Sequence, residues 1–335
     1  MKKILIPIIL ATICAGGAAA WLFCSRTTNT QDSRIYIPSG STYEAVVDTL
    51  KAHDILSSTT TFSIWAKLRN YPTLVKSGSY VIKPQQSLFR LVGKLRSGNQ
   101  DAIRITINKY RTKEQFCQFV ASKLEFDAGS LDSAISSDSI CQSYGFSPAT
   151  IFTLFPQNTY EIYWNTSPKQ FLDRMEKEYR QFWNESRTKA AEALGLTPAE
   201  VVTLASIVEE ETNKNDEKPL IASVYLNRLR QGILLQADPT VKYACGDFTL
   251  QRITAKQLVV ESPYNTYRHR GLPPGPICLP GVASINAVLE NRQSKYLYFC
   301  AKEDFSGYHN FAVTLSEHLT NAARFHAALN QRGIR

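Results

Sequence analysis

Near the start of the chain a short pattern recurs three times. Each copy is an alternating apolar and polar run, a turn, and an amphipathic helix, and the runs are Arg34–Ile37, Gly78–Ile82 and Ile103–Ile107. Alternation with period 2 predicts a half-buried strand, and the switch to helical spacing predicts the helix that follows. Each copy is too small to bury a core alone, so we expect one mixed α/β domain over residues 34–125.

Each of these helices has its own start or stop signal. Ser41 and Thr112 are both followed three residues later by Glu or Gln, which is the spacing of a capping box. The middle helix is expected from about Ser87 to Leu95, closed by Gly98. The pattern therefore predicts both the elements and their limits.

Helical spacing dominates the second half of the chain. Residues 126–150 are rich in Ser and Asp with weak periodicity, and we interpret them as a connector. A helix is expected from Pro168 to about Trp183, and Gly195 should end the next one. We expect residues 151–335 to form a mainly helical domain, so the predicted fold class is α+β.

The clearest helix start in the chain is Thr197-Pro198-Ala199-Glu200. Thr197 is the expected cap, Pro198 occupies the first helical position, and Glu200 completes a capping box. The residues that follow are apolar over most of the helix circumference. Such a helix is buried.

This helix ends in three consecutive glutamates. At about 100° per residue, Glu210 falls in a narrow polar strip and is expected to be solvated, whereas Glu209 and Glu211 face apolar sectors. Desolvation and the helix dipole both raise the pKa of such a carboxyl, and a carboxyl protonated near neutral pH can act as a general acid. A solvated charge run at a fraying helix end is the alternative.

The N-terminal segment has the length of a membrane span. Ile4–Phe23 contains 20 residues without a charge, and at ~1.5 Å per residue this covers a ~30 Å hydrocarbon core. Two preceding lysines favour a cytoplasmic N-terminus. We expect residues 1–24 to be a single-pass anchor in the cell inner (cytoplasmic) membrane, with residues 25–33 as a linker and the rest on the periplasmic side. A signal peptide cleaved after residues 18–20 is the alternative.

Composition narrows the range of partners. The chain has 335 residues, of which 44% are hydrophobic and 20% charged, and this is typical of globular domains. Its net charge of +9 is spread without a long Lys/Arg block. Diffuse positive charge suits an anionic membrane surface or an acidic polymer, and the absence of a basic stripe argues against a nucleic-acid partner.

The seven cysteines contain no CxxC pair, so a zinc site is not expected. No His, Cys or carboxylate cluster has metal-ligand spacing, and we predict neither a metal nor another cofactor. Most of the cysteines are expected to be small buried side chains. In an oxidising compartment two of the cysteines could form one disulfide, and the sequence does not identify which two.

Several segments carry the motifs of a known family. They are Leu204–Thr212, Ala222–Leu229, Leu235–Val241, Tyr264–Tyr267 and Gly271–Gly281. On these motifs the chain resembles the MltG (YceG-like) family of endolytic murein transglycosylases, over residues 34–330. The resemblance implies that Glu209, the first glutamate of the ExE pair, is catalytic, and that residues 34–125 are LysM-like. It also implies a substrate-binding set, namely Gln236, Asp238, Thr240, Asn265, Tyr267, Pro274, Gly275 and Pro276.

Several residues of these motifs also have a purely structural interpretation. Asp238 before Pro239 is expected to cap a helix. The Pro- and Gly-rich loop Gly271–Pro276 suits a groove wall for a sugar chain, or is simply a turn. Tyr267 and its neighbours are sugar-binding groups or half-buried surface residues, and His309 has a hydrogen-bonding or a packing role.

Two segments depart from the family pattern. The Leu154–Tyr160 segment has Gln157 and Asn158 where the family usually has a single acid, which puts its substrate role in doubt. The turn Asn108–Arg111 lacks the usual Pro and Gly. We expect the second departure to affect only the auxiliary domain.

The resemblance implies cleavage of the bond between N-acetylmuramic acid and N-acetylglucosamine, leaving a 1,6-anhydro end and terminating or releasing nascent strands. Peptidoglycan glycan strands are the expected partner, and a peptidoglycan synthase at the membrane is a further candidate. A hydrolysing muramidase, with Asp238 or Glu211 as second carboxylate, is the enzymatic alternative. A non-catalytic peptidoglycan-binding scaffold is the alternative from another class.

Overall fold

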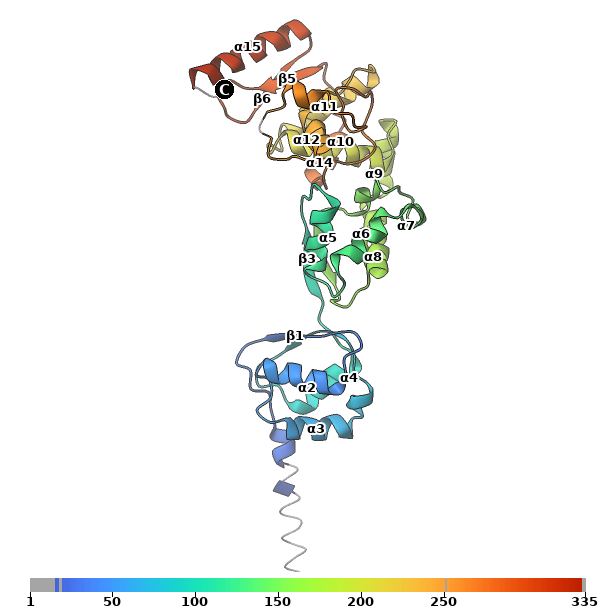
Figure 1. Ribbon diagram of the computed structural model, residues 1–335, viewed down its shortest axis with the longest axis vertical. Coiled ribbons are helices and arrows are strands. Elements are labelled where there is room, and N and C mark those ends of the chain that lie inside the picture. The colour runs from blue at the N-terminus through green and yellow to red at the C-terminus, as the bar shows by residue number, and fades with distance from the viewer. Residues whose placement is uncertain (1–15, 18–19, 251, 333–335) are drawn as a thin grey trace, which may run out of the picture. The chain divides into compact units, whose positions relative to one another are not determined.

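The computed structural model describes residues 16–17, 20–250 and 252–332 (Figure 1). Its contacts divide the chain into two compact units. The first comprises Met1–Ile105, Ala121–Asp127 and Tyr160–Ser167, and the second comprises Thr106–Val120, Ala128–Thr159 and Pro168–Arg335. The described residues are mostly helical with small two-stranded sheets. The predicted α+β class is confirmed.

The first unit is a two-stranded antiparallel sheet covered by helices. Its elements are β1 (Ser33–Ile37), α2 (Tyr43–Ala52), α3 (Thr59–Leu68), the 3-10 helix Tyr71–Thr73, β2 (Gly78–Ile82) and α4 (Leu88–Ser97). Strand β1 pairs with β2 in a register that places Ile35 opposite Tyr80. Both of these side chains are fully buried in one core. Alternation along β1 therefore packs one of its faces, as period 2 predicts.

The expected repeat is present in the first unit, with differences. Ser87 caps α4, and Gly98 ends it in the left-handed conformation, as predicted. The predicted cap at Ser41 is wrong, because Thr42 accepts the hydrogen bond from Ala45 N instead. Helix α3 was not predicted. The third copy lies in another sheet, where β3 (Ile103–Ile107) is paired with β4 (Asn158–Ile162).

Residues 25–33, expected to be a linker, are hydrogen-bonded to the first unit. Thr27 N donates to Gln86 O at 2.8 Å, and Thr28 N donates to Ile55 O at 3.0 Å. The Thr27 side chain is 1% exposed. This polar segment is therefore attached to the first unit by hydrogen bonds.

Most of the expected membrane anchor lies outside the described residues, since residues 1–15 and 18–19 are not among them. Within the described part of the chain, no single helix meets the length and apolarity required to span a bilayer. One bent pair of helices, Glu185–Ala193 with Pro198–Glu211, meets the two requirements when taken together, by length and composition alone.

The second unit is built around one buried helix, α10 (Pro198–Glu211). The other helices of this unit are α5 (Lys113–Ala121), α6 (Ala128–Ser136), α7 (Asp138–Ser143), the 3-10 helix Ile151–Leu154, α8 (Pro168–Phe182), α9 (Glu185–Ala193), α11 (Lys218–Arg230), α12 (Asp238–Cys245), α13 (Ala255–Leu258), α14 (Val282–Leu289) and α15 (Leu315–Gln331). Strands β5 (Tyr298–Ala301) and β6 (His309–Ala312) pair antiparallel. The stretch 126–150, expected as a connector, thus contains two helices.

Candidate active site

Helix α10 begins as the sequence predicts. Thr197 and Glu200 form a reciprocal capping box, with Pro198 in the first turn. Every residue from Val201 to Val208 is buried. The core thus holds the helix rigidly up to its last turn, where Glu209, Glu210 and Glu211 point into three different surroundings.

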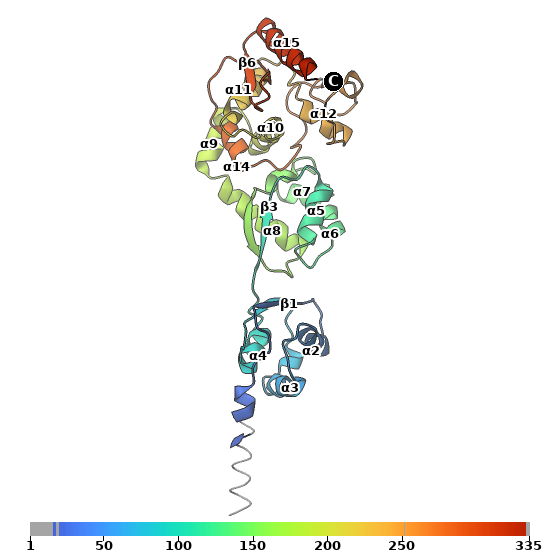
Figure 2. The same ribbon diagram turned by 90° about the vertical axis from the view of Figure 1, so that its left-hand side faces the viewer.

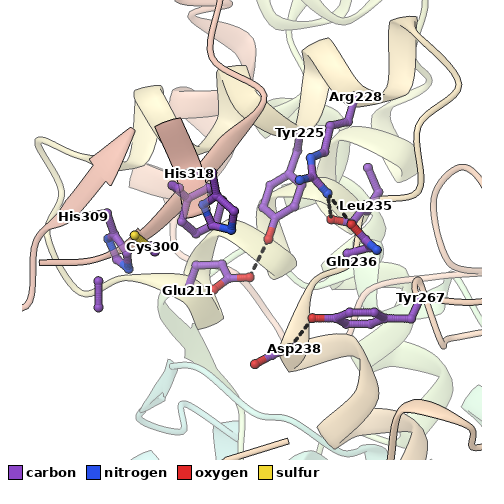
Figure 3. Close-up of a pocket in the computed structure, with 12 residues that line it drawn as sticks. Glu211, Tyr225, Arg228, Leu235, Gln236, Asp238, Tyr267, Cys300, His309 and His318 are labelled. Carbon is purple, nitrogen blue, oxygen red and sulfur yellow. Dashed lines mark hydrogen bonds between the residues drawn. The ribbon is translucent and has the colours of Figure 1, made fainter. Parts of the chain in front are cut away.

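Glu211 lines a pocket of about 450 Å³. The hydroxyl of Tyr225, on α11, donates a hydrogen bond of 2.5 Å to Glu211 Oε1 (Figure 3). Burial raises the pKa of Glu211 to about 7, against the lowering effect of the Tyr225 hydrogen bond, and the charge of Asp238 adds to the rise. A substantial fraction of Glu211 is therefore protonated near neutral pH.

Glu210 has the opposite electrostatic surroundings. Arg111 Nε and Nη2 donate to its two oxygens at 3.0 and 2.8 Å, and Lys109 Nζ lies 3.3 Å from Oε1. Burial raises the pKa of Glu210, but the hydrogen bonds and charges of Arg111 and Lys109 outweigh it, so the net pKa is lowered. The expectation that Glu210 is solvated is wrong, because its side chain is 12% exposed. The turn that holds Arg111 contacts α10 directly, so its effect extends beyond the auxiliary domain.

Glu209 is held in a polar cluster. Lys218 Nζ lies 2.9 Å from Glu209 Oε2, and Ser284 Oγ donates to the same oxygen. The side chains of Glu209 and Lys218 are 16% and 6% exposed. Glu209 is not among the residues that line the Glu211 pocket. Its carboxyl is thus the counter-ion of a buried lysine.

Two residues of the implied binding set stand together opposite Glu211. Tyr267 Oη donates to Asp238 Oδ1 at 2.6 Å, and both side chains line the pocket (Figure 3). The predicted capping role of Asp238 is wrong, since Ala237 is the cap residue of α12 and Asp238 lies in the first turn. The Asp238 carboxylate is therefore directed to the pocket, where burial and this hydrogen bond raise the pKa of Tyr267.

Gln236, also implied as a binding residue, is fixed in the same pocket. Its backbone has φ 53°, a left-handed conformation that is uncommon outside glycine. Arg228 Nη1 donates to Gln236 Oε1 at 3.2 Å and to Leu235 O at 2.9 Å. Because Arg228 engages the amide oxygen, the amide Nε2 of Gln236 is the group left to donate to a ligand.

His309 also lines this pocket, oriented by a buried carboxylate. His309 Nδ1 lies 2.7 Å from Glu217 Oε2, and the His309 backbone N donates to Glu217 Oε1 at 2.7 Å. Glu217 is 5% exposed. A carboxylate acceptor requires a proton on Nδ1, which leaves Nε2 as the second polar atom of the ring. Glu217 was not predicted, because no motif of the sequence singles it out.

Thr240 and Asn265 are fully buried and do not line the pocket. Thr240 Oγ1 donates to Ala237 O at 2.7 Å, and Asn265 Nδ2 donates to Leu258 O at 3.0 Å. Asn265 Oδ1 also accepts from Tyr267 N at 3.0 Å. These two side chains hold the segments that carry Asp238 and Tyr267.

The loop that contains Pro274, Gly275 and Pro276 packs elsewhere in the second unit. A Cβ added to Gly275 would collide with the carbonyl oxygen of Ala149. Ile277 N donates to Ser206 Oγ at 2.9 Å, which fastens the end of the loop to α10. Pro274 is exposed, whereas Gly275 and Pro276 are buried. None of the three lines the Glu211 pocket.

Among the residues that the structure describes, no group of three or more His, Cys, Asp and Glu side chains is arranged to hold a metal ion. Cys117, Cys141 and Cys278 are buried free thiols. Burial raises the pKa of Cys278 well above its usual value. These thiols are packing residues, as the sequence predicts.

Comparisons with known proteins identify the family of the chain. The family model described as YceG-like matches residues 35–324. An endolytic murein transglycosylase of Bacillus subtilis is 29% identical, covering 89% of this chain and 86% of its own. One of Streptococcus pneumoniae is 27% identical over 88% of this chain and 60% of its own. The crystal structure of a YceG-like protein from Listeria monocytogenes aligns with a TM-score of 0.57 at 28% identity, covering 87% of this chain and 99% of that chain.

Proposed function

The chain belongs to the YceG-like family, and on this premise we propose that it is an endolytic lytic transglycosylase of peptidoglycan. It cleaves the bond between N-acetylmuramic acid and N-acetylglucosamine within a glycan strand and leaves a 1,6-anhydro end. Relatives named endolytic murein transglycosylases, similar over most of this chain, support the proposal. Such cleavage would terminate or release nascent strands.

The general acid in this proposal is Glu211. The observation that carries the assignment is a carboxyl with pKa about 7 in the wall of a pocket lined by Asp238 and Tyr267. A general acid is most effective when its pKa lies near the working pH, because both protonation states are then accessible. The ionised Glu210 beside it cannot donate a proton at that pH.

The reaction needs one carboxyl that acts twice. Protonated Glu211 gives its proton to the glycosidic oxygen, the bond from C1 to that oxygen breaks, and the N-acetylglucosamine hydroxyl leaves. The resulting Glu211 carboxylate then takes the proton of the muramoyl 6-hydroxyl, whose oxygen closes on C1. The acid is regenerated, and water takes no part. A fixed Tyr225 hydrogen bond keeps the carboxyl in one orientation through both steps.

Glu209 is the competing assignment, and it stays a prediction of the family resemblance. Its carboxyl faces Lys218 and Ser284. Glu209 also does not line the pocket that contains Glu211, Asp238 and Tyr267, and its Oε2 lies 2.9 Å from the Lys218 ammonium. Geometry therefore favours Glu211 over Glu209, and separate variants of the two residues decide between them.

We further propose that Ile4–Phe23 anchors the protein in the cytoplasmic membrane, with the second unit on the extracytoplasmic side. The support is the uncharged length of that run and the two lysines before it. Peptidoglycan strands assembled at the membrane are then the substrate, and a synthase at the membrane is a candidate partner.

A hydrolysing muramidase is the second candidate, because Asp238 lines the same pocket as Glu211 and could serve as a second carboxylate. Digestion of purified peptidoglycan followed by mass spectrometry separates the two reactions. If the new muramic acid ends are 1,6-anhydro ends, the result supports transglycosylation. If they are reducing ends, the reaction is hydrolysis and the proposal is wrong. Binding without any shortened glycan would favour a scaffold.

A further inference from the structure

The first unit has an exposed apolar surface at the end where the described chain begins. It consists of Trp21, Phe23, Ile64, Leu68 and Phe89, and we call it the end surface. These five are among the twelve large hydrophobic side chains that are exposed in the described residues. Ile64 and Leu68 are four residues apart on α3 and share one face of it. The helical residues 20–24 lie beside α3 in both views (Figures 1 and 2).

Ring contacts join the end surface into one piece. The Trp65 ring lies 5.0 Å from Phe23 and 5.0 Å from Phe89, both edge-to-face. Trp65 Nε1 donates to Leu22 O at 3.2 Å. The guanidinium of Arg69 covers Phe89 at 4.4 Å. Three segments of the chain therefore form a continuous aromatic surface with a cationic border.

Charge is unevenly distributed in this unit. Residues 55–100, which contain α3 and α4, hold seven Lys and Arg and no Asp or Glu. Residues 26–54 hold three Lys and Arg and four Asp and Glu. Lys67 adjoins Leu68 and Arg90 adjoins Phe89, and both are exposed. Basic side chains thus border the apolar ones without acidic neighbours in the same segment.

The end surface is continuous with the apolar N-terminal run. The run ends at Phe23, whose ring packs on Trp65. Directly after it, Arg26 forms a bridge with Ser87, and Thr27 N donates to Gln86 O. These bonds leave no free tether between the run and the folded unit. A bilayer that holds the run must therefore come close to α3.

We propose that the end surface docks on the surface of an anionic lipid bilayer. Trp, Phe and Leu side chains can be buried at the boundary between lipid headgroups and acyl chains, and lysine and arginine beside them attract anionic headgroups. The first unit would then be fixed against the membrane. This inference rests on the proposed N-terminal anchor, and the experiment below separates the two.

The experiment uses the full chain in vesicles of phosphatidylglycerol and phosphatidylethanolamine. The photoreactive amino acid p-benzoyl-phenylalanine replaces Leu68 in one variant and Asp48, an exposed residue of α2, in the matched control. Flotation of the vesicles reports on the anchor, and the mass of the irradiated protein reports lipid adducts. We expect both variants to float, with at least tenfold more lipid adduct at position 68 than at position 48. Phosphatidylcholine vesicles should lower the adduct at position 68 severalfold.

Each other outcome overturns the inference in a distinct way. Floating protein without lipid adducts at position 68 rejects docking and leaves the anchor intact. Equal amounts of lipid adduct at positions 68 and 48 would show that the end surface is not a specific lipid-binding surface. Crosslinks from position 68 to a second copy of the chain, or to added glycan strands, assign the surface to that partner instead. Protein that fails to float rejects the anchor and the docking together.

Discussion

The pKa values of two neighbouring carboxyl groups at the end of α10 are displaced in opposite directions because their partners differ. Glu210 faces two cations and has a lowered pKa, whereas the half-buried carboxyl of Glu211 is desolvated near the charge of Asp238 and has a pKa of about 7. Such a separation distinguishes an acid from a permanently charged neighbour. At the residue scale, the proposed chemistry therefore depends on the proton of Glu211.

The proton of Glu211 should make cleavage depend on pH. Since the protonated form of Glu211 donates the first proton, kcat/KM should fall as the pH rises through about 7. This fall is the alkaline limb of the pH–rate profile. Asp238 raises the pKa of Glu211, so Asp238→Asn should move the limb to lower pH. Lys242 lowers the pKa of Glu211, so Lys242→Met should move the limb to higher pH. Initial rates on labelled peptidoglycan across pH 5–9 measure both shifts.

The two variants control for each other, because a nonspecific loss of activity would lower the rate without moving the limb. Shifts in opposite directions identify one titrating group between the two charges. A limb that stays in place in both variants would mean that another group controls the rate.

At this scale the sequence predicted part of the site. The helical projection placed Glu209 and Glu211 in apolar sectors, and motif resemblance selected Gln236, Asp238 and Tyr267, which line the pocket. Periodicity could not separate the two glutamates, because Lys218 lies on the following helix and its pairing with Glu209 is a tertiary contact. Only the resemblance selected Glu209. Glu217 was missed for the same reason, since its partner His309 is distant in the chain.

At the element scale, the Glu209–Lys218 pair joins the end of α10 to the start of α11. Glu209→Gln leaves the nearly buried ammonium of Lys218 without its carboxylate partner. We expect a loss of unfolding free energy on the order of 2 kcal/mol, because an unpaired buried charge is costly. Urea denaturation measures it.

The control for this prediction is the double variant Glu209→Gln with Lys218→Met, which removes the charge together with its partner. More than half of the lost stability should return. If Glu209→Gln alone were as stable as the parent protein, the pair would have no structural role.

The Pro- and Gly-rich loop allows a second test between elements. Gly275→Ala places a Cβ against the carbonyl oxygen of Ala149. This oxygen belongs to the backbone, so relieving the clash requires a backbone shift, which costs stability. We expect a loss of about 1–3 kcal/mol, typical of overpacking. Gly281→Ala is the matched control, because its nearest contacts are 3.5 Å away. Thermal unfolding should separate the two variants, and equal midpoints would contradict the packing described.

Local signals predicted the elements better than their pairing. The capping box at Thr197 and the stop at Gly98 are set by neighbouring residues, and both are confirmed. Arg111 was expected to matter only to the auxiliary domain, but it binds Glu210 on α10. Pairing of this kind depends on the tertiary fold, which periodicity does not encode.

At the scale of the whole molecule, the sequence indicated a diffuse positive charge, and the fold shows where part of it lies. Seven of the basic residues fall in residues 55–100, around helices α3 and α4. The predicted anchor is mostly outside the described residues, so its test is the vesicle experiment above. The catalytic proposal is independent of that outcome.

A metal-independent reaction is expected of the whole protein. The proposed mechanism uses one carboxyl and a hydroxyl already tethered to the substrate, so no step requires a cation. Cleavage of peptidoglycan should be unchanged in excess EDTA, with the untreated protein as control. Loss of cleavage that zinc or magnesium restores would contradict the mechanism.

The most direct test of the account compares Glu211→Gln with Glu209→Gln on purified peptidoglycan, with equal amounts of folded protein. The measurement is the rate at which new 1,6-anhydro ends form. We predict that Glu211→Gln lowers this rate at least ~100-fold, the scale of a lost general acid, while its fold is retained. Glu209→Gln should keep at least about a tenth of the rate, because the proposed mechanism assigns both proton transfers to Glu211. The reverse order, with Glu211→Gln active and Glu209→Gln inactive, would contradict the account.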